Sequence, residues 1–353
     1  MRDFIYNQPA RRVVFGAGSI EKLHNEVKRL GISRAVVISM PAEQHFAEEA
    51  HARLAELSAG IYSEVVAQHV PIEMLRKARE DAKALGADGY VVIGGGSTVG
   101  VGKGLALETG LPIVAVPTTY AGSEMTNIYG ITEDGLKKTG RDDRVLPKTV
   151  LYDVNFTLSL PPQISGPSGM NAMAHCVEAL YAQDTNPIVV LMAAEGIRAL
   201  ARALPIVVKE PSNVEARLDA QYGAWLSGVS LGSAGTAIHH KLCHTLGGSF
   251  GMPHAPTHTV ILPHATAYNR DAAPDAMRIA ADALGATDAA QGIFDLIETI
   301  GAPTSLKEIG MPEDGLDKAA DIAVQNPYWN PRPIERDAIR ELLDNAYHGR
   351  RPV

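Results

Sequence analysis

The 353-residue sequence predicts two domains, an α/β domain followed by an all-α domain. In the first half, short runs rich in β-branched residues alternate with amphipathic helical stretches, which favours a parallel sheet with helices on both faces. Beyond about Phe156, long Ala- and Leu-rich stretches replace this alternation. We therefore expect an α/β domain over residues 1–156 and an all-α domain over residues 157–353.

Individual elements follow from hydrophobic periodicity and from β-branched content. In the first domain the expected strands are 34–39, 62–66, 89–93 and 112–116, and the expected helices are 43–58, 72–85 and 98–107. In the second domain the expected helices are 172–182, 187–204 and 214–231. These three are apolar on all sides, so several of them should be buried. The Pro-rich segments 160–167 and 326–333 are linker candidates.

Composition excludes several classes of protein. A net charge of −8 gives no support for nucleic-acid binding. Cys176 and Cys243 are the only cysteines, which argues against a disulfide scaffold and suits a reducing compartment. Neither a signal peptide nor a membrane-spanning segment is recognisable. We expect a cytoplasmic protein without nucleic-acid or membrane partners.

A glycine-rich turn, Gly94-Gly95-Gly96-Ser97, joins an expected strand to an expected helix. Glycines there allow close approach of a diphosphate, and free N–H groups at the helix start favour the anion. Thr118 and Thr119 follow the next strand, at the edge of the sheet where ligands bind. These six residues are candidates for dinucleotide binding. The alternative is a tight turn without a ligand, since the chain lacks the G-x-G-x-x-G form.

Histidines occur at metal-site spacing in the second half. His240 and His244 stand at i and i+4, His254 lies ten residues further on, and Asn171 and His175 repeat the i, i+4 spacing upstream. Three imidazoles and one oxygen are a usual donor set for a divalent metal, but the oxygen here belongs to a neutral amide. The alternatives are buried core histidines, with Asn171 as a helix cap or structural amide.

Four motifs in this order carry a family resemblance: Gly94-Gly-Gly-Ser97, Gly122-Ser-Glu-Met-Thr126, Asn171-Ala-x-x-His175 and His240-x-x-x-His244 with Pro253-His254. Together they resemble iron-containing (group III) alcohol dehydrogenases over nearly the whole chain. The resemblance implies a dehydroquinate synthase-like fold, with a dinucleotide-binding α/β domain, an all-α domain and a homodimeric assembly. It also implies that the family's metal ligands map to Asn171, His175, His240 and His254, and that His244 lies near the nicotinamide.

Two departures from the family pattern narrow the resemblance. Asn171 stands where the family has Asp, and Gly100 stands where many members have Asp. With the segments Tyr120–Thr126 and 326–332, they are similar to a branch that reduces maleylacetate to 3-oxoadipate with NADH or NADPH, in the catabolism of aromatic compounds. Chlorinated maleylacetates are expected substrates too. The resemblance implies that no divalent metal is required. We expect His244 and His254 to lie nearest the reacting atoms, with His175 and His240 lining the pocket beside Asn171.

A dicarboxylate substrate and an anionic cofactor both need cationic or polar contacts. We expect Ser123 and Lys138 to contact the cofactor. Candidates for the substrate are Tyr120, Arg141, Tyr328 and Arg332. For each cation the alternative is a solvated surface charge, and Lys103 and Tyr120 can equally be structural residues.

Three other functions remain open. A metal-dependent alcohol dehydrogenase acting on a small alcohol or aldehyde would use Asn171 as a tolerated ligand. A lyase resembling dehydroquinate synthase would need more Lys and Arg than the sequence offers. A binding module without catalysis is the weakest alternative, because the glycine turn and the histidines occur together.

Overall fold

The computed structural model describes residues 4, 6, 9, 11–64, 70–133, 136–325 and 328–353. The chain forms two compact units, one running from Gln8 to Leu160 and the other from Pro161 to Val353. Residues 4 and 6 join the second unit. The sequence placed the division after residue 156.

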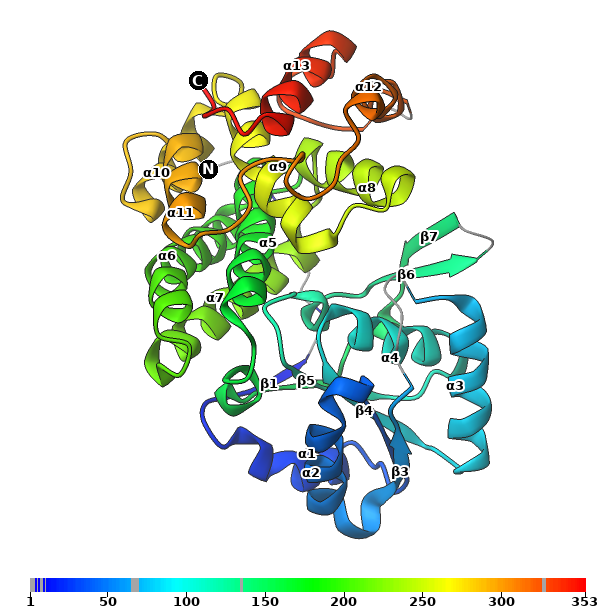
Figure 1. The fold of residues 1–353 in the computed structure, drawn as a ribbon. Helices are drawn as coiled ribbons and strands as arrows, with labels where there is room; N and C mark the ends of the chain where they lie inside the picture. The colour runs from blue at the N-terminus through cyan, green and yellow to red at the C-terminus, as the bar shows by residue number, and fades with distance from the viewer. Residues whose placement is uncertain are drawn as a thin grey trace. The chain divides into compact units, whose positions relative to one another are not determined.

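The first unit is built on a six-stranded sheet in the order β1-β8-β5-β4-β2-β3 (Figure 1). Every pairing in it is parallel. The strands are β1 Arg12–Phe15, β2 Ala35–Ile38, β3 Ser58–Tyr62, β4 Gly89–Gly94, β5 Ile113–Pro117 and β8 Thr149–Tyr152. The helices are α1 Leu23–Arg29, α2 Gln44–Leu54, α3 Ile72–Ala84 and α4 Gly96–Thr109. A parallel sheet with helices between its strands is what the alternating pattern predicted.

Successive side chains of the central strand enter different cores. In β4, Val91 and Ile93 pack with residues of α1 and α2, such as Val27. Tyr90 and Val92 pack with residues of α3 and α4. Because side chains alternate across a strand, this division shows that helices cover both faces of the sheet.

Three local features differ from the sequence prediction. The third strand ends at Tyr62, where the predicted strand 62–66 begins, because Ser58–Tyr62 pairs with β2; residues 65 and 66 lie outside the described part of the chain. An antiparallel hairpin, β6 Ile128–Glu133 with β7 Leu136–Arg141, was not predicted. The expected linker 160–167 is largely helical, since α5 begins at Pro162. Proline is well tolerated at the first helical position.

The second unit is helical throughout its regular structure, among the residues described. Its helices are α5 Pro162–Tyr181, α6 Pro187–Lys209, α7 Val214–Ser233, α8 Ile238–Phe250, α9 His254–Tyr268, α10 Pro274–Leu284, α11 Ala289–Thr299, α12 Leu316–Ala323 and α13 Arg336–Tyr347. Helices α5, α6 and α7 pack against one another (Figure 1). Glycine permits their close approach, because a Cβ on Gly196 would lie 2.7 Å from Cys176 Sγ.

Helices α8 and α9 share a core with α12 and α13. Leu242, Leu246, Ile261 and Leu343 belong to it, and all are 0% exposed. This core fixes the two helices that carry six of the twelve histidines. No helix in the described residues is long and apolar enough to cross a membrane.

Candidate functional site

The glycine turn ends β4 and begins α4. Gly94 has φ +153°, and a Cβ there would lie 2.4 Å from Thr98 Oγ1. Gly95 is the N-cap of α4 and offers no side chain to its first turn. The N–H groups at the start of α4 are therefore available for an anion such as a diphosphate.

Both threonines expected at the cofactor site lie against this turn. Thr118 N donates to Gly94 O at 3.3 Å, and a Cβ on Gly95 would lie 3.0 Å from Thr119 Cγ2. The structure thus brings Gly94–Ser97, Thr118 and Thr119 together at the carboxyl edge of the sheet, as the sequence predicted.

An acidic residue that the sequence analysis did not use lies at the same edge. Thr118 Oγ1 donates to Glu43 Oε1 at 2.5 Å. Glu43 Oε2 lies 3.0 Å from the position of a Cβ on Gly94 and is buried without a hydrogen-bond partner. Burial raises the pKa of this carboxyl group, although the Thr118 bond opposes the change. Glu43 follows β2, where dinucleotide-binding sheets place the acid that contacts a ribose.

The remaining candidates of the first unit lie on its hairpin and on the segment before it. Lys138 in β7 is exposed and pairs with Glu133 at 2.6 Å. Arg141 is also exposed, and its Nη1 donates to Asn127 Oδ1 at 3.5 Å. Ser123 presents its carbonyl to Lys103 Nζ at 2.7 Å. Tyr120 is 0% exposed, so it packs inside the unit in this structure.

Six histidines form one cluster in the helical unit. The ring of His240 lies with its centroid 5.1 Å from that of His175, 6.0 Å from that of His244 and 5.1 Å from that of His258. His258 in turn lies 4.3 Å from His254, and His239 lies 5.2 Å from His240. The cluster thus includes all four histidines that the sequence singled out.

Helical spacing explains how the cluster forms. Asn171, His175 and Glu178 stand at i, i+4 and i+7 on α5 and therefore share one face. On α8 and α9 the i, i+4 pairs are His240 with His244 and His254 with His258. Asn171 lies well inside α5, which begins at Pro162, so it is not a helix cap.

Glu178 organises the cluster. Its carboxylate accepts His240 Nδ1 at 2.6 Å, and it also accepts the backbone N–H groups of Ala237 at 3.0 Å and His239 at 2.8 Å. Ala237, the N-cap of α8, has no side-chain oxygen, so Glu178 supplies the missing cap from a different helix. A neutral His240 therefore carries its proton on Nδ1, and its Nε2 is an acceptor.

Buried and exposed members of the cluster differ in chemistry. Asn171, His175 and His240 are 4–5% exposed, and Asn171 Oδ1, His175 Nδ1 and His240 Nε2 have no hydrogen-bond partner. Burial lowers the pKa of His175 well below its usual range, and His240, His254 and His244 lower it further. His175 is therefore neutral at neutral pH. His244 and His254 are exposed, so they are accessible to a ligand.

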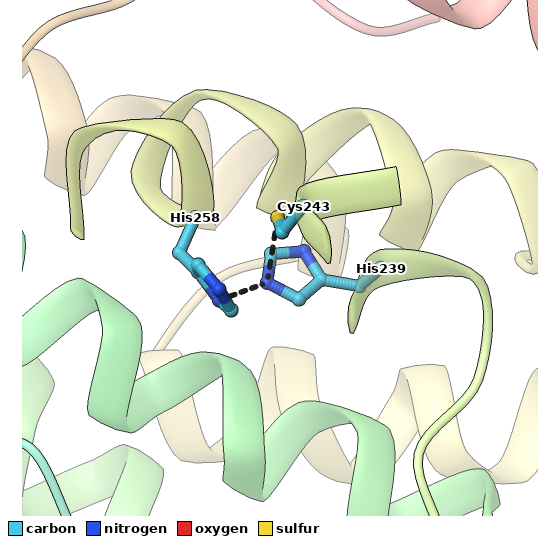
Figure 2. A group of neighbouring side chains, drawn as sticks. All are labelled: His239, Cys243 and His258. Atoms are coloured by element: carbon cyan, nitrogen blue, oxygen red, sulfur yellow. Dashed lines mark hydrogen bonds between the residues drawn. The ribbon is translucent and has the colours of Figure 1, made fainter. Parts of the chain in front are cut away.

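Two histidines of the cluster, His239 and His258, form a smaller group with Cys243 (Figure 2). His239 Nε2 lies 3.0 Å from His258 Nδ1 and 3.7 Å from Cys243 Sγ. In the described part of the chain this is the one set of three or more His, Cys, Asp or Glu side chains whose ligand atoms all lie within 4.8 Å of each other. His175, His240 and His254 do not meet that condition.

The positions that match the family's metal ligands do not fit a tightly held iron ion. Asn171 contributes a neutral amide oxygen in place of a carboxylate, and the ligand atoms of the three histidines do not converge within 4.8 Å. Loss of the only anionic ligand weakens binding of a hard divalent cation. We therefore derive no reaction step through a metal at these positions.

The two candidates from the C-terminal tail both contact aromatic or cationic groups. The Arg332 guanidinium lies 4.2 Å from the centroid of the Tyr268 ring, and Arg332 Nη1 donates to Tyr268 O at 3.4 Å. Lys241 Nζ lies 5.4 Å from the ring centroid of Tyr328. Burial raises the pKa of Tyr328, and the nearby Glu178 carboxylate raises it further.

Sequence reasoning missed two histidines of the cluster, His239 and His258, and two residues that contact it, Glu178 and Cys243. Each had a detectable signal, because Glu178 lies three residues after His175, and His239–Cys243 and His254–His258 repeat the i, i+4 spacing. Glu43 was given no role in the sequence analysis. His239 and His240 both have a possible ligand at i+4, so spacing alone does not show which of these two faces of α8 lines the substrate site.

The chain belongs to the iron-containing alcohol dehydrogenase family. The model of "Iron-containing alcohol dehydrogenase" matches residues 10–154, and that of "Fe-containing alcohol dehydrogenase family, C-terminal" matches residues 166–347. The two domains that the sequence resemblance implied, an α/β domain and an all-α domain, are thus each matched by a model of this family.

Several full-length relatives are named maleylacetate reductase. The chain is 54% identical to maleylacetate reductase of Burkholderia cepacia over 352 residues, covering 100% of both chains. Crystal structures of maleylacetate reductase from Agrobacterium tumefaciens and from Rhizobium sp. strain MTP-10005 superpose with TM-scores of 0.97 and 0.96. Both are 50% identical to this chain, with 100% of each chain covered. The branch of the family inferred from the two departures is the one these relatives occupy.

Proposed function

We propose that this protein reduces maleylacetate to 3-oxoadipate with a nicotinamide cofactor. The observation that carries the proposal is the exposed pair His244 and His254 in a cluster that has an amide, Asn171, in place of the family's carboxylate. Identity of 54% to a maleylacetate reductase over the full chain supports it.

Maleylacetate is a 4-oxo-2-enedioate, and its reduction needs one hydride and one proton. Hydride from the cofactor adds to the alkene carbon β to the ketone, and negative charge develops on the ketone oxygen as an enolate. A proton then reaches the α carbon, which gives 3-oxoadipate and the oxidised cofactor. Preorganised hydrogen-bond donors stabilise such an oxyanion without a Lewis acid.

Each histidine suits a different part of this chemistry. His240 has its Nδ1 proton engaged by Glu178, so its free Nε2 is an acceptor and cannot donate to the enolate while the ring is neutral. The exposed His244 and His254 are therefore the proposed donors to the enolate oxygen and the proposed source of the proton. Asn171 and His175 are proposed to line the pocket.

The cofactor is proposed to bind at the glycine turn as NADH or NADPH, through Gly94–Ser97, Thr118 and Thr119. Glu43 lies beside Gly94 and Thr118, so its carboxylate would repel a 2′-phosphate placed near it. We therefore expect NADH to be the better cofactor. Ser123 and Lys138 are retained as proposed cofactor contacts, and Arg141, Tyr328 and Arg332 as proposed contacts of the substrate.

The test is oxidation of NADH and NADPH with maleylacetate, before and after exhaustive chelation. Equal activity in both states is expected, since no step uses a metal. Loss of activity on chelation that Fe²⁺ or Zn²⁺ restores would contradict the metal-free mechanism. Reduction of NAD with small alcohols, in place of maleylacetate reduction, would favour an alcohol dehydrogenase.

Asn171→Asp tests the reason for metal independence. The added carboxylate should raise the affinity for a divalent ion at Asn171, His175, His240 and His254, as measured by metal analysis of the purified variant. The proposal also includes a homodimer as the assembled form and the cytoplasm as its location.

A further inference from the structure

The group of His239, Cys243 and His258 shares no residue with the positions that match the family's iron ligands, although its imidazoles lie beside those of His240 and His254. We propose that these three side chains bind a divalent transition-metal cation, such as Zn²⁺ or Co²⁺. None of the three is among Asn171, His175, His240 and His254, and the inference does not rest on the proposed reductase function.

The backbone holds the three ligands on two packed helices. His239 and Cys243 stand at i and i+4 on α8, and His258 comes from α9, which packs against α8. All three side chains point toward one another (Figure 2). Their exposed fractions are 0%, 4% and 1%. Ligands on regular helices in a packed interior are positioned more precisely than ligands on loops.

Two of the three distances between the ligand atoms are close to those around a tetrahedral ion, and all three are below 4.8 Å. Zn–N bonds of about 2.0–2.1 Å and Zn–S bonds of about 2.3 Å place two nitrogens about 3.3 Å apart, and a nitrogen and a sulfur about 3.6 Å apart. The corresponding distances are 3.0 Å for His239 Nε2 to His258 Nδ1, and 3.7 Å for Cys243 Sγ to His239 Nε2. For an ion to bind, the two imidazole nitrogens must separate by about 0.3 Å and the hydrogen bond between them must be replaced by bonds to the metal.

Charge balance favours a divalent ion. On binding, the Cys243 thiol releases one proton to solvent and becomes a thiolate, and the proton between the two imidazoles moves to an outer ring nitrogen. The thiolate and the nearby Glu178 carboxylate together carry two negative charges. Glu178 accepts the His239 backbone N–H at 2.8 Å. Burial and the Glu178 charge both raise the pKa of the Cys243 thiol, so the thiolate forms only together with a bound cation. A thiolate with two imidazoles selects Zn²⁺ or Co²⁺ over Mg²⁺ or Ca²⁺.

Co²⁺ binding tests this site through its sulfur ligand. The purified full-length protein is stripped with chelator and titrated with Co²⁺, and the near-ultraviolet band of thiolate-to-cobalt charge transfer is recorded with the bound stoichiometry. The chain has only two cysteines, and Cys176 is buried elsewhere, on α5. Cys176→Ala is therefore a matched control for Cys243→Ala.

We expect one Co²⁺ per chain with the sulfur band in the wild type and in Cys176→Ala, and loss of the band in Cys243→Ala. His258→Gln should weaken Co²⁺ binding at least tenfold. Zn²⁺ should raise the thermal midpoint of the wild type by a few degrees and leave that of Cys243→Ala unchanged.

Three results would overturn the inference. The first is a wild-type protein that binds no Co²⁺, which would show that the group is only a hydrogen-bonded histidine pair with a neighbouring thiol. The second is binding without a sulfur band, which would place the ion at other residues, and the third is a band that persists in Cys243→Ala. His244→Ala separates this inference from the proposed function, because it should lose reductase activity and keep the band.

Discussion

The glycine turn and the histidine cluster are built by opposite means. At the turn, the proposed function depends on the absence of side chains, since a Cβ on Gly94 would lie 2.4 Å from Thr98 Oγ1. In the cluster, the proposed function depends on imidazole side chains, one of which, that of His240, is oriented by the Glu178 carboxylate. We therefore expect the glycine turn to be sensitive to added side-chain atoms, and the histidine cluster to be sensitive to the loss of side chains. Substitutions at each region test this contrast.

His244→Ala should have the largest effect. Loss of a general acid or oxyanion donor lowers turnover by about 10²–10⁴-fold, whereas the KM for the cofactor should change little because the glycine turn is untouched. Steady-state kinetics with maleylacetate measure both constants. His348→Ala, which removes an exposed histidine outside the cluster, is the control. Unchanged turnover in His244→Ala would remove that residue from the mechanism.

Gly94→Ala should act on the cofactor instead. At φ +153° alanine is strained, and a backbone penalty of about 2 kcal/mol corresponds to a roughly 30-fold rise in the KM for the nicotinamide cofactor. Gly110→Ala is the matched control, because Gly110 also has positive φ but has no atom within 4 Å of its added Cβ. A Gly110→Ala protein with the same rise in KM would show that strain in the unit, and not the site, is responsible.

Glu178→Gln should lower turnover by about tenfold, as is usual for the partner of a functional histidine. The amide keeps the size of the side chain but removes its charge. It can accept through only one oxygen, while the carboxylate accepts three groups. The pH profile of turnover should also shift, because the partner of His240 has changed, and Glu178→Asp should restore part of the activity. A fall in stability with kinetics and pH profile unaltered would show that Glu178 is only a helix cap.

Lys103 links the stability of the first unit to pH. It is 1% exposed and donates to Ser123 O, Thr126 Oγ1 and Ile128 O, and burial lowers its pKa to about 7. Above that pH the unfolded chain keeps a proton that the folded protein has lost, so stability rises with pH up to the unfolded pKa near 10.4.

Relative to Lys103→Met, the wild type should therefore gain about 2 kcal/mol of unfolding free energy between pH 7 and pH 9. Urea denaturation at the two pH values measures this gain, with the exposed Lys83→Met as the control. A difference independent of pH would mean that Lys103 remains charged throughout.

Glu43→Gln should have the smallest effect. Removing the negative charge beside the glycine turn should raise kcat/KM for NADPH relative to NADH by about fivefold, or about 1 kcal/mol. Glu48→Gln, on the exposed part of α2, should leave the ratio unchanged. An unchanged ratio in Glu43→Gln would show that this carboxylate does not contact the cofactor's ribose region.

The contrast between the two regions also explains what the sequence could predict. The turn was predictable because Gly94–Ser97 is contiguous and its role depends on the backbone, which strand and helix patterns predict. The histidines were predictable as i, i+4 pairs. The spacing from His175 places Glu178 on the same helical face, but its role was not predictable. Its partners Ala237 and His240 are about sixty residues away in the chain and meet it only in the folded structure.

Element boundaries failed where long-range pairing decided them. Ser58–Tyr62 has fewer β-branched residues than the predicted strand 62–66. It nevertheless forms β3, because it pairs with Ala35–Ile38. The hairpin Ile128–Arg141 was missed since its second strand, Leu136–Arg141, is rich in charge and has no apolar alternation.

The three hydrogen bonds that meet on Glu178 also couple the dynamics of a ring to those of a helix end. If the Glu178 carboxylate moves away, the His240 ring and the amides of Ala237 and His239 lose their acceptor together. Hydrogen exchange at these two amides would therefore report how long Glu178 stays in place. The exchange rates of the Ala237 and His239 amides would thus report on the Glu178 side chain in the absence of substrate and cofactor.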